Sequence, residues 1–270
     1  MLKINIKKYL IMKKIIIIGA GAMGSAFAVP CLENKNEVTI IGTHLEDDLI
    51  DSIKSNNNFH PALKVELPTK LKVEKYEKLK SILEREVDII VAGVSSIGIE
   101  WFVNQISKNY KKNLPIILLT KGLAIEDNEL ITLSDKIKKL LKKQGHEEVN
   151  VSAIKGPCLA AGLAYKMRTG TVIANPDIKE TEKLKKIIST DYYSTEISDD
   201  LTGVELAGAI KNIYSMLIGA SEGLSNSKAP KEIQSKYYLN TSASLIHRSI
   251  SEMVEFVSYY GGKVDTVYGL

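Results

Sequence analysis

The sequence predicts an α/β protein, with a doubly wound Rossmann-type parallel sheet followed by an all-helical domain. Three observations predict this class. Short apolar runs alternate with helical stretches up to residue 198, a glycine-spaced turn follows the first run, and two long helical stretches without a strand follow residue 199. Such alternation is typical of a parallel sheet that is covered by helices on both faces.

The glycine-spaced turn is the most specific of these features. Four isoleucines at 15–18 lead directly into Gly19-Ala20-Gly21-Ala22-Met23-Gly24. Glycines at this spacing permit a tight turn, close approach of the backbone to a pyrophosphate and close packing of helix on strand. The helix that begins near Met23 would direct its unpaired N–H groups at the phosphates. The turn therefore predicts a site for NAD or NADP.

The other apolar runs and the stretches between them complete the predicted sheet. We expect strands at Ile15–Ile18, Val38–Ile41, Val87–Val94, Ile116–Leu119, Val149–Ile154 and Thr171–Ala174. The expected crossover helices are Met23–Glu33, Glu46–Ser55, Trp101–Asn109, Asn128–Lys143 and Lys179–Ser189. Right-handed crossovers place the carboxyl ends of the strands on one edge, where ligands bind in such folds. Residues 93–96, 120–122 and 155–157 fall on that edge, and Val94 and Ser95 are candidate cofactor contacts.

The chain changes character near Asp199. Residues 199–224 and 230–260 read as long helices, with Asp199 and Asp200 suited to a helix N-terminus and Gly261 and Gly262 to a helix end. The predicted division is an extension over residues 1–11, a dinucleotide-binding domain over 12–198 and a helical substrate domain over 199–270. We assign no function to the extension, which lacks the apolar core and cleavage site of a signal peptide.

Composition excludes several classes of function. The net charge of +4 is spread over 36 basic and 32 acidic residues, without the basic and aromatic stripe of nucleic-acid binders. No run approaches the roughly 20 apolar residues of a membrane span. Cys31 and Cys158 have no metal-ligand spacing, so we expect no metal, and so few cysteines suit a reducing cytoplasm.

Three further motifs could carry chemistry, and each has a simpler alternative. Thr120-Lys121-Gly122 places a lysine on the binding edge. The same pattern also fits a solvent-exposed loop lysine without a function. Gly156-Pro157 is a constrained turn, and backbone N–H groups there could face an anion. The same residues also fit a turn with a structural role only.

The third motif places Lys211 on a helical face of small side chains. Val204, Ala207, Gly208, Lys211 and Ser215 share one face at helical spacing. Burial against such a face would lower the pKa of the lysine and make it a workable proton donor near neutrality. A surface lysine that extends its charged end into water is the alternative.

The preferred cofactor stays open in the sequence. Dinucleotide-binding domains that prefer NAD often carry an acid about 20 residues beyond the glycine turn, where it bonds the ribose hydroxyls. Here the second strand ends in Gly42-Thr43-His44, and Glu46 comes later. Thr43 and His44 could bond either cofactor, and His44 could equally be a solvent-facing loop residue. His60, His146 and His247 have no ligand spacing, so we interpret them as structural or exposed.

Taken together, these motifs resemble the NAD(P)-dependent glycerol-3-phosphate dehydrogenases from Met12 to Leu270. The resemblance rests on the glycine turn, Thr120-Lys121-Gly122, the Gly156-Pro157 turn and the helix from Gly203-Val204-Glu205-Leu206 to Lys211-Asn212, in that order. Residues 58–61 also look like the loop that follows the second strand in the family.

The resemblance implies a role for each matching residue. Lys211 would exchange a proton with the C2 oxygen of a phosphorylated three-carbon substrate, while hydride moves between nicotinamide and C2. Lys121 would bind and polarise that substrate, and Asn212 would help to hold it. Gly156, Cys158 and Ala160 match the turn that borders substrate or cofactor. The resemblance also implies a homodimer.

The sequence departs from the family in two places. Cys158 stands where the family usually has serine, which weakens or removes one hydroxyl hydrogen bond. The family continues beyond a Gly-Leu such as Gly269-Leu270 with a Gly-x-Gly-Asp-Leu segment and an Arg-Asn pair that grips phosphate, so we expect the helical domain to be incomplete. A 3-hydroxyacid or ketopantoate-type reductase and a non-catalytic dinucleotide-binding module remain alternative functions.

Overall fold

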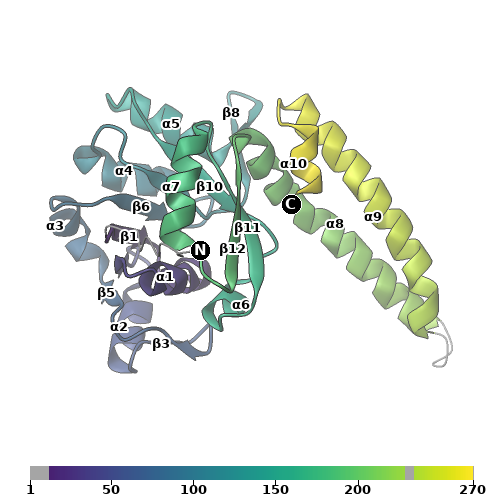
Figure 1. Ribbon diagram of the computed structural model, residues 1–270, viewed down its shortest axis with the longest axis horizontal. Coiled ribbons are helices and arrows are strands. Elements are labelled where there is room, and N and C mark those ends of the chain that lie inside the picture. The colour runs from purple at the N-terminus through teal and green to yellow at the C-terminus, as the bar shows by residue number, and fades with distance from the viewer. Residues whose placement is uncertain (1–11, 229–233, 270) are drawn as a thin grey trace, which may run out of the picture.

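The computed structural model describes residues 12–228 and 234–269. They form a sheet with helices on both faces and a pair of long helices that projects from one end (Figure 1). The predicted extension over residues 1–11 lies outside the described residues.

One eight-stranded sheet forms the centre of the fold. Its order is β5 (Lys72–Glu74), β2 (Glu37–Ile41), β1 (Lys14–Ile18), β6 (Ile89–Ala92), β7 (Ile116–Leu118), β10 (Val151–Lys155), β11 (Thr169–Ala174) and β12 (Tyr193–Ser198). All pairings from β5 to β10 are parallel, in the strand order of a doubly wound dinucleotide-binding sheet. This arrangement confirms the predicted fold class and places the carboxyl ends of β1, β6, β7 and β10 on one edge.

The far end of the sheet departs from the all-parallel prediction. Strand β11 is antiparallel to β10, and β12 is parallel to β11. The chain leaves β10 at Lys155 and passes through the short helix α6 (Ala160–Ala164) before it enters β11. A helix of five residues is too short to cross the face of the sheet, so the chain re-enters from the same edge and runs backwards.

Helices cover the sheet on both faces. The helices are α1 (Ala22–Glu33), α2 (Asp47–Ser55), α3 (Leu79–Leu83), α4 (Ile99–Ile106), α5 (Leu133–Lys143) and α7 (Ile178–Ile188), with 3-10 turns at Tyr76–Lys78 and Ser107–Asn109. Ile15 and Ile17 lie in the same core as Phe27 of α1, whereas Ile16 and Ile18 lie in a second core with Phe102 of α4. Because successive side chains of a strand point to opposite faces, one run of isoleucines fills both layers.

The prediction of a helix over Asn128–Lys143 is wrong for its first residues. Strand β9 (Glu129–Thr132) pairs with β8 (Leu123–Glu126) in a hairpin, and α5 begins only at Leu133. Asp127 and Asn128 both have positive φ, the conformation that a two-residue hairpin turn requires. A second small ribbon pairs β3 (Phe59–His60) with β4 (Val65–Glu66).

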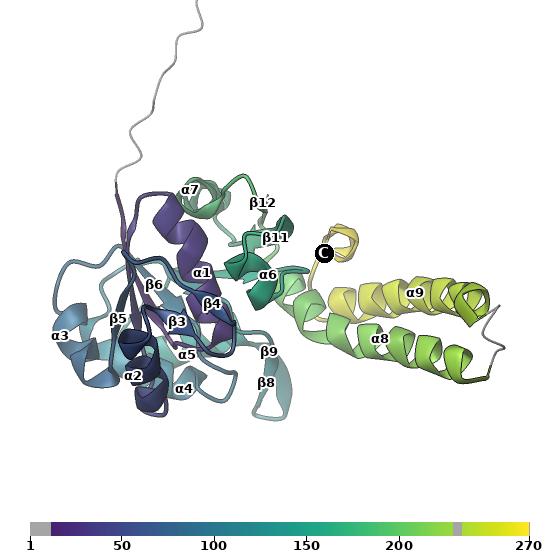
Figure 2. The same ribbon diagram turned by 90° about the horizontal axis from the view of Figure 1, so that it is seen from below.

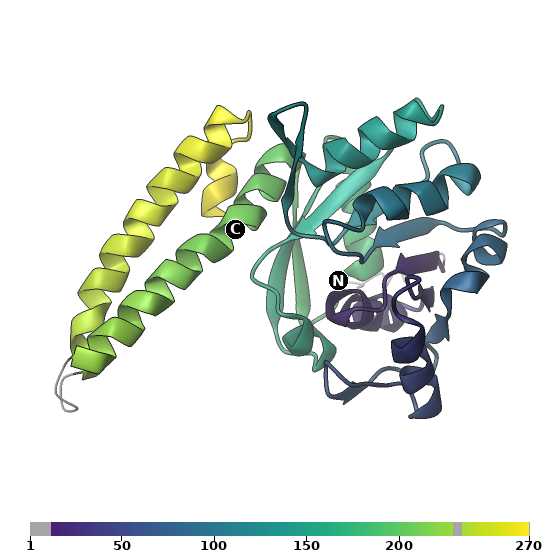
Figure 3. The same ribbon diagram turned by 180° about the vertical axis from the view of Figure 1, so that it is seen from behind.

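The predicted helical region forms an antiparallel pair and a short return helix. Helices α8 (Leu201–Lys228) and α9 (Gln234–Tyr259) lie side by side and project from the sheet, as Figures 2 and 3 show, and α10 (Val264–Tyr268) was not predicted. No helix in the described ranges is both long and apolar enough to cross a bilayer.

Asp200 joins the start of α8 to the residues before α10. Its carboxylate accepts hydrogen bonds from the N–H of Gly203 at 2.9 Å, the N–H of Lys263 at 2.8 Å and the hydroxyl of Thr266 at 2.5 Å. The expectation that Asp200 caps a helix is confirmed, and the cap also fixes the chain that returns from α9.

Candidate active site

The glycine turn, residues 19–24, is built by close contact between backbones. Gly19 has φ +110°, and a Cβ there would lie 2.7 Å from the carbonyl carbon and oxygen of Gly93. A Cβ on Gly24 would lie 2.4 Å from the carbonyl oxygen of Gly19. By contrast, the nearest atom to a Cβ on Gly21 would be Glu46 Oε1 at 3.9 Å. Gly19 and Gly24 are therefore needed by the fold, whereas Gly21 leaves open space.

That open space lies at the N-terminus of α1. Gly21 is the N-cap residue, and the first backbone bond into the helix runs from the N–H of Ser25 to Gly21. The N–H groups of Ala22 and Met23 belong to the first turn, whose donors have no acceptor within a helix. An uncrowded helix N-terminus fits the diphosphate of a dinucleotide.

Two side chains to which the sequence assigned no role in the turn hold it in place. Glu46 Oε2 accepts the N–H of Ala20 at 3.0 Å and the N–H of Thr43 at 2.7 Å, which joins the turn to the end of β2. His60 is buried, with Nε2 3.0 Å from the carbonyl oxygen of Ala20, and its Nδ1 accepts the N–H of Leu63. His60 is thus structural, as expected, but its contact to the turn comes from a distant ribbon that no local pattern reveals.

The remaining cofactor candidates lie along the same edge with different exposure. His44 is exposed and its ring lies 5.2 Å from that of Trp101 and 6.3 Å from that of Tyr76, measured between centroids. Val94 is buried and its carbonyl accepts the hydroxyl of Thr120 at 2.7 Å, while Ser95 is exposed.

Lys121 follows β7 on this edge and its ammonium influences three neighbours. Its side chain is exposed, and Gly122 beside it has φ +138°. The charge of Lys121 adds to the effect of burial in lowering the pKa values of Lys211 and Lys155, and it opposes the rise that burial causes in the pKa of Cys158. Lys121 therefore acts electrostatically on residues of β10, of α8 and of the turn after β10.

Lys211 is half-buried on α8, on the face of small residues that the sequence predicted. Val204 and Ala207 on that face are fully buried, and Ser215 is exposed. Burial, and then the charge of Lys121, lower the pKa of Lys211. The neighbouring Asn212 is exposed.

The turn after β10 has a structural explanation for its glycine. Gly156 has φ +147°, and a Cβ there would lie 2.9 Å from the Cα of Thr171 on β11. Cys158 is 7% exposed, and burial raises the pKa of its thiol while Lys121 opposes that effect. Ala160 begins α6 and is half-buried.

Sequence reasoning missed two buried charged residues behind these candidates. Lys155, the last residue of β10, is 2% exposed, and Glu205 on α8 is fully buried. Burial lowers the pKa of Lys155 and raises the pKa of Glu205, and the charge of each residue partly offsets the effect of burial on the other. We call Lys121, Lys155 and Lys211 the lysine site.

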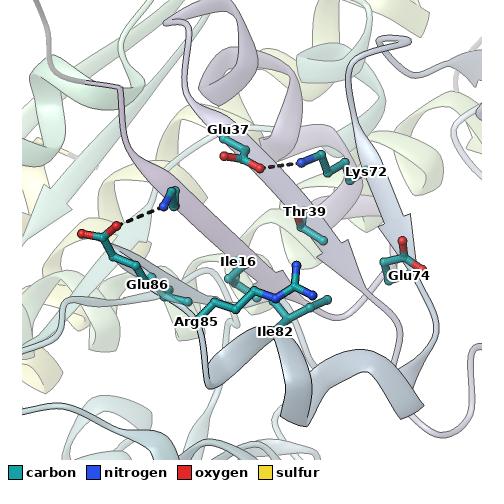
Figure 4. A pocket seen from close by; sticks show the side chains of 10 residues that line it. Ile16, Glu37, Thr39, Lys72, Glu74, Ile82, Arg85 and Glu86 are labelled. Atoms are coloured by element: carbon teal, nitrogen blue, oxygen red, sulfur yellow. Dashed lines mark hydrogen bonds and ion pairs between the residues drawn. The ribbon is translucent and has the colours of Figure 1, made fainter.

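A pocket elsewhere on the sheet does not belong to this edge. It has a volume of about 280 Å³ and is lined by β1, β2, β5 and the residues around α3, including Glu37, Lys72 and Arg85 (Figure 4). Its rim is occupied by the ion pairs Lys72–Glu37 and Lys14–Glu86. In the described part of the chain, no group of three or more His, Cys, Asp or Glu residues could hold a metal ion.

Comparison with known proteins decides the family of this chain. Residues 14–181 match the NAD-dependent glycerol-3-phosphate dehydrogenase N-terminus, and residues 200–270 match the C-terminus of the same family. The chain belongs to the NAD-dependent glycerol-3-phosphate dehydrogenase family. The predicted resemblance is confirmed.

Individual glycerol-3-phosphate dehydrogenases match over most of this chain. The NADP(+)-dependent glycerol-3-phosphate dehydrogenase of Archaeoglobus fulgidus is 34% identical over 254 residues, which are 94% of this chain and 72% of that protein. The glycerol-3-phosphate dehydrogenase [NAD(P)+] of Clostridium botulinum strain Alaska E43 is 28% identical, over 96% of this chain and 72% of that protein.

A solved structure of the family also matches. The crystal structure of glycerol-3-phosphate dehydrogenase from Coxiella burnetii has a TM-score of 0.77 and 26% identity. The match covers 96% of this chain and 73% of that one.

Proposed function

We propose that this chain transfers hydride reversibly between NAD(P)H and dihydroxyacetone phosphate, which gives glycerol 3-phosphate. The observation that carries the proposal is the half-buried Lys211, whose pKa is lowered by burial and by Lys121, on the edge that also holds the glycine turn. Family membership supports the choice of substrate, because the matching relatives are named glycerol-3-phosphate dehydrogenases.

The glycine turn would hold the dinucleotide. The N–H groups at the start of α1 would bind the diphosphate, and Gly21 would leave room for it. Thr43, His44, Val94 and Ser95 line the same edge and would contact the rest of the cofactor, with Val94 limited to its backbone by burial. When bound, the dinucleotide supplies or accepts the hydride.

The lysine site would hold the substrate and move the proton. An ammonium with a lowered pKa releases its proton more readily, so Lys211 would protonate the C2 oxygen during reduction and remove that proton during oxidation. Lys121 would attract the phosphate and stabilise the developing alkoxide. Asn212 and the turn at Gly156, Cys158 and Ala160 would border the substrate.

Replacement of Lys211 tests the proton-transfer role. We expect Lys211→Met to lower kcat by about 100- to 10,000-fold, the usual contribution of a positioned proton donor. The affinity for NADH, measured by its fluorescence, should stay within twofold because the glycine turn is intact. Lys142→Met, an exposed lysine on α5, is the matched control and should keep full activity.

The pH profile adds a second readout. Reduction requires the ammonium form of Lys211, so kcat should fall as pH rises through the lowered pKa, below the ordinary lysine value of 10.5. Unchanged turnover in Lys211→Met would exclude the proton-transfer role. Faster turnover of non-phosphorylated 3-hydroxyacids or ketopantoate would select another reductase, and dinucleotide binding without turnover would select a binding module.

We also propose the division into a dinucleotide domain at 12–198 and a helical domain from 199, a homodimer and a cytoplasmic location. The two cysteines are buried and unpaired, which suits a reducing compartment. Exposed apolar side chains on the projecting helices, such as Met216, Leu217 and Ile246, supply surface for association. Sedimentation at several concentrations tests the dimer.

A further inference from the structure

Lys155 is an unusual residue for the interior of a sheet. Its side chain is 2% exposed, and Nζ lies 2.5 Å from the carbonyl oxygen of Thr120 and 3.4 Å from that of Leu118. Leu118 is the last residue of β7, and Thr120 lies two residues beyond it. The buried ammonium thus binds the backbone immediately before Lys121.

The aliphatic part of Lys155 is also the surface on which α8 packs. A Cβ on Gly208 would lie 3.1 Å from both Cβ and Cγ of Lys155. Gly208 is three residues before Lys211, so Lys155 contacts the helix one turn away from the proposed proton donor. One side chain therefore contacts both elements that carry the proposed catalytic lysines.

Glu205 is a second buried charged residue, and its charge raises the pKa of Lys155 against the effect of burial. It is fully buried, and Oε1 accepts the N–H of Ser134 in the first turn of α5 at 3.2 Å. Among the described residues, Oε2 has no hydrogen-bond partner. Burial raises the pKa of Glu205, whereas the charge of Lys155 and the N–H of Ser134 at the start of α5 oppose that rise.

We propose that Lys155 is a positioning residue that holds the Thr120–Lys121 backbone in register with Lys211 on α8. The inference rests on the proposed function, since it assigns Lys155 to the same reaction. Lys155 touches neither substrate nor cofactor in this account. It fixes the distance between the strand end that carries Lys121 and the helix that carries Lys211.

The charge balance around Lys155 agrees with this role. Burial, with a smaller contribution from Lys121, lowers its pKa to about 8, although the charge of Glu205 opposes both effects. Glu205 on α8 and Lys121 after β7 are the charged groups that act on it. Below about pH 8 the protonated amine can therefore make charge-assisted bonds to the two carbonyl groups.

Two variants separate positioning from charge balance. Lys155→Met keeps the approximate length of the side chain but removes its donors, and it removes the positive charge that acts on the buried Glu205. The double variant Lys155→Met/Glu205→Gln removes both charges. We expect the double variant to recover the stability that the single variant loses, because an uncompensated buried charge is the main cost.

Activity should not recover with stability. In both variants we expect KM for dihydroxyacetone phosphate to rise at least tenfold, kcat to fall less and the affinity for NADH to stay within twofold. Lys142→Met is the matched control and should behave as the unmodified chain. A double variant with unchanged KM would overturn the inference.

Hydrogen exchange provides a readout that does not need turnover. Loss of the Lys155 bonds should raise amide exchange over residues 120–123 at least tenfold in both variants, with the glycine turn unchanged. If the unmodified chain does not turn over dihydroxyacetone phosphate, the proposed function fails. Exchange over 120–123 then tests the positioning contact by itself, and unchanged exchange overturns it.

Discussion

The glycine turn and the lysine site lie on the same edge of the sheet, but different contacts hold them. Gly19, Gly24 and Gly93 touch through backbone atoms, at distances that exclude any side chain. The lysine site depends on one buried ammonium, Lys155, that bonds to the carbonyl groups of another strand. Gly19 and Gly24 therefore tolerate almost no increase in residue size, whereas the lysine site responds to a change in charge.

The largest effect should separate two glycines of the same turn. Gly24→Ala places a methyl group 2.4 Å from the Gly19 carbonyl oxygen and should lower the free energy of unfolding by about 3 kcal/mol. Gly21→Ala, with 3.9 Å of clearance, should leave that free energy unchanged but weaken NADH binding. Urea denaturation and NADH fluorescence measure the two effects. Equal loss of stability in both variants would contradict the distinction.

The next effect concerns the charged contact at the base of the helices. Asp200→Ala removes the acceptor of three hydrogen bonds, two of them from backbone N–H groups, and should cost about 2 kcal/mol in the free energy of unfolding. Asp199→Ala is the control, because Asp199 makes an exposed ion pair with Lys263 and its loss should cost much less. If Asp200→Ala and Asp199→Ala lose the same free energy of unfolding in urea denaturation, the buried hydrogen bonds of Asp200 contribute no more than the exposed ion pair.

The smallest effect tests whether charge matters at the glycine turn as well. Glu46 carries a negative charge between the turn and the end of β2, near where dinucleotide folds place the adenosine ribose. Glu46→Gln should shift the ratio of NADPH to NADH use toward NADPH by about fivefold, which corresponds to about 1 kcal/mol of repulsion removed.

Asp48→Asn, an exposed acid on α2, is the control for this third prediction. It should leave the cofactor ratio as it is. If Glu46→Gln leaves the ratio of NADPH to NADH use unchanged, the charge of Glu46 does not influence the choice of cofactor.

The sequence predicted the parts of the fold that local patterns encode. Continuous apolar runs identified the buried strands β1, β2, β6, β7 and β10. Strands β5 and β12 escaped prediction because they lie at the edges of the sheet and alternate with polar residues, as in Lys72–Glu74. The reversed direction of β11 depends on the path of a five-residue helix, which periodicity does not determine.

In the candidate site, too, local patterns predicted some residues, whereas others depend on tertiary packing. The motifs around Lys121 and Lys211 could be read from short stretches, but Lys155 and Glu205 could not. Their relation spans fifty residues and depends on how α8 packs against β10 at Gly208. Likewise, His60 reaches Ala20 across forty residues. A long-range contact of a single side chain produces no repeating hydrophobic pattern, so the sequence alone does not predict it.

The Asp200 contact gives the projecting helices a fixed end. With about 1.5 Å of rise per residue, Lys211 lies about 15 Å from the start of α8, and the end of that helix at Lys228 lies about 40 Å from it. A swing of α8 about Asp200 would therefore move the distal end nearly three times as far as Lys211, the proposed proton donor. In such a swing, a displacement at the tip of the hairpin would shift Lys211 by a much smaller distance.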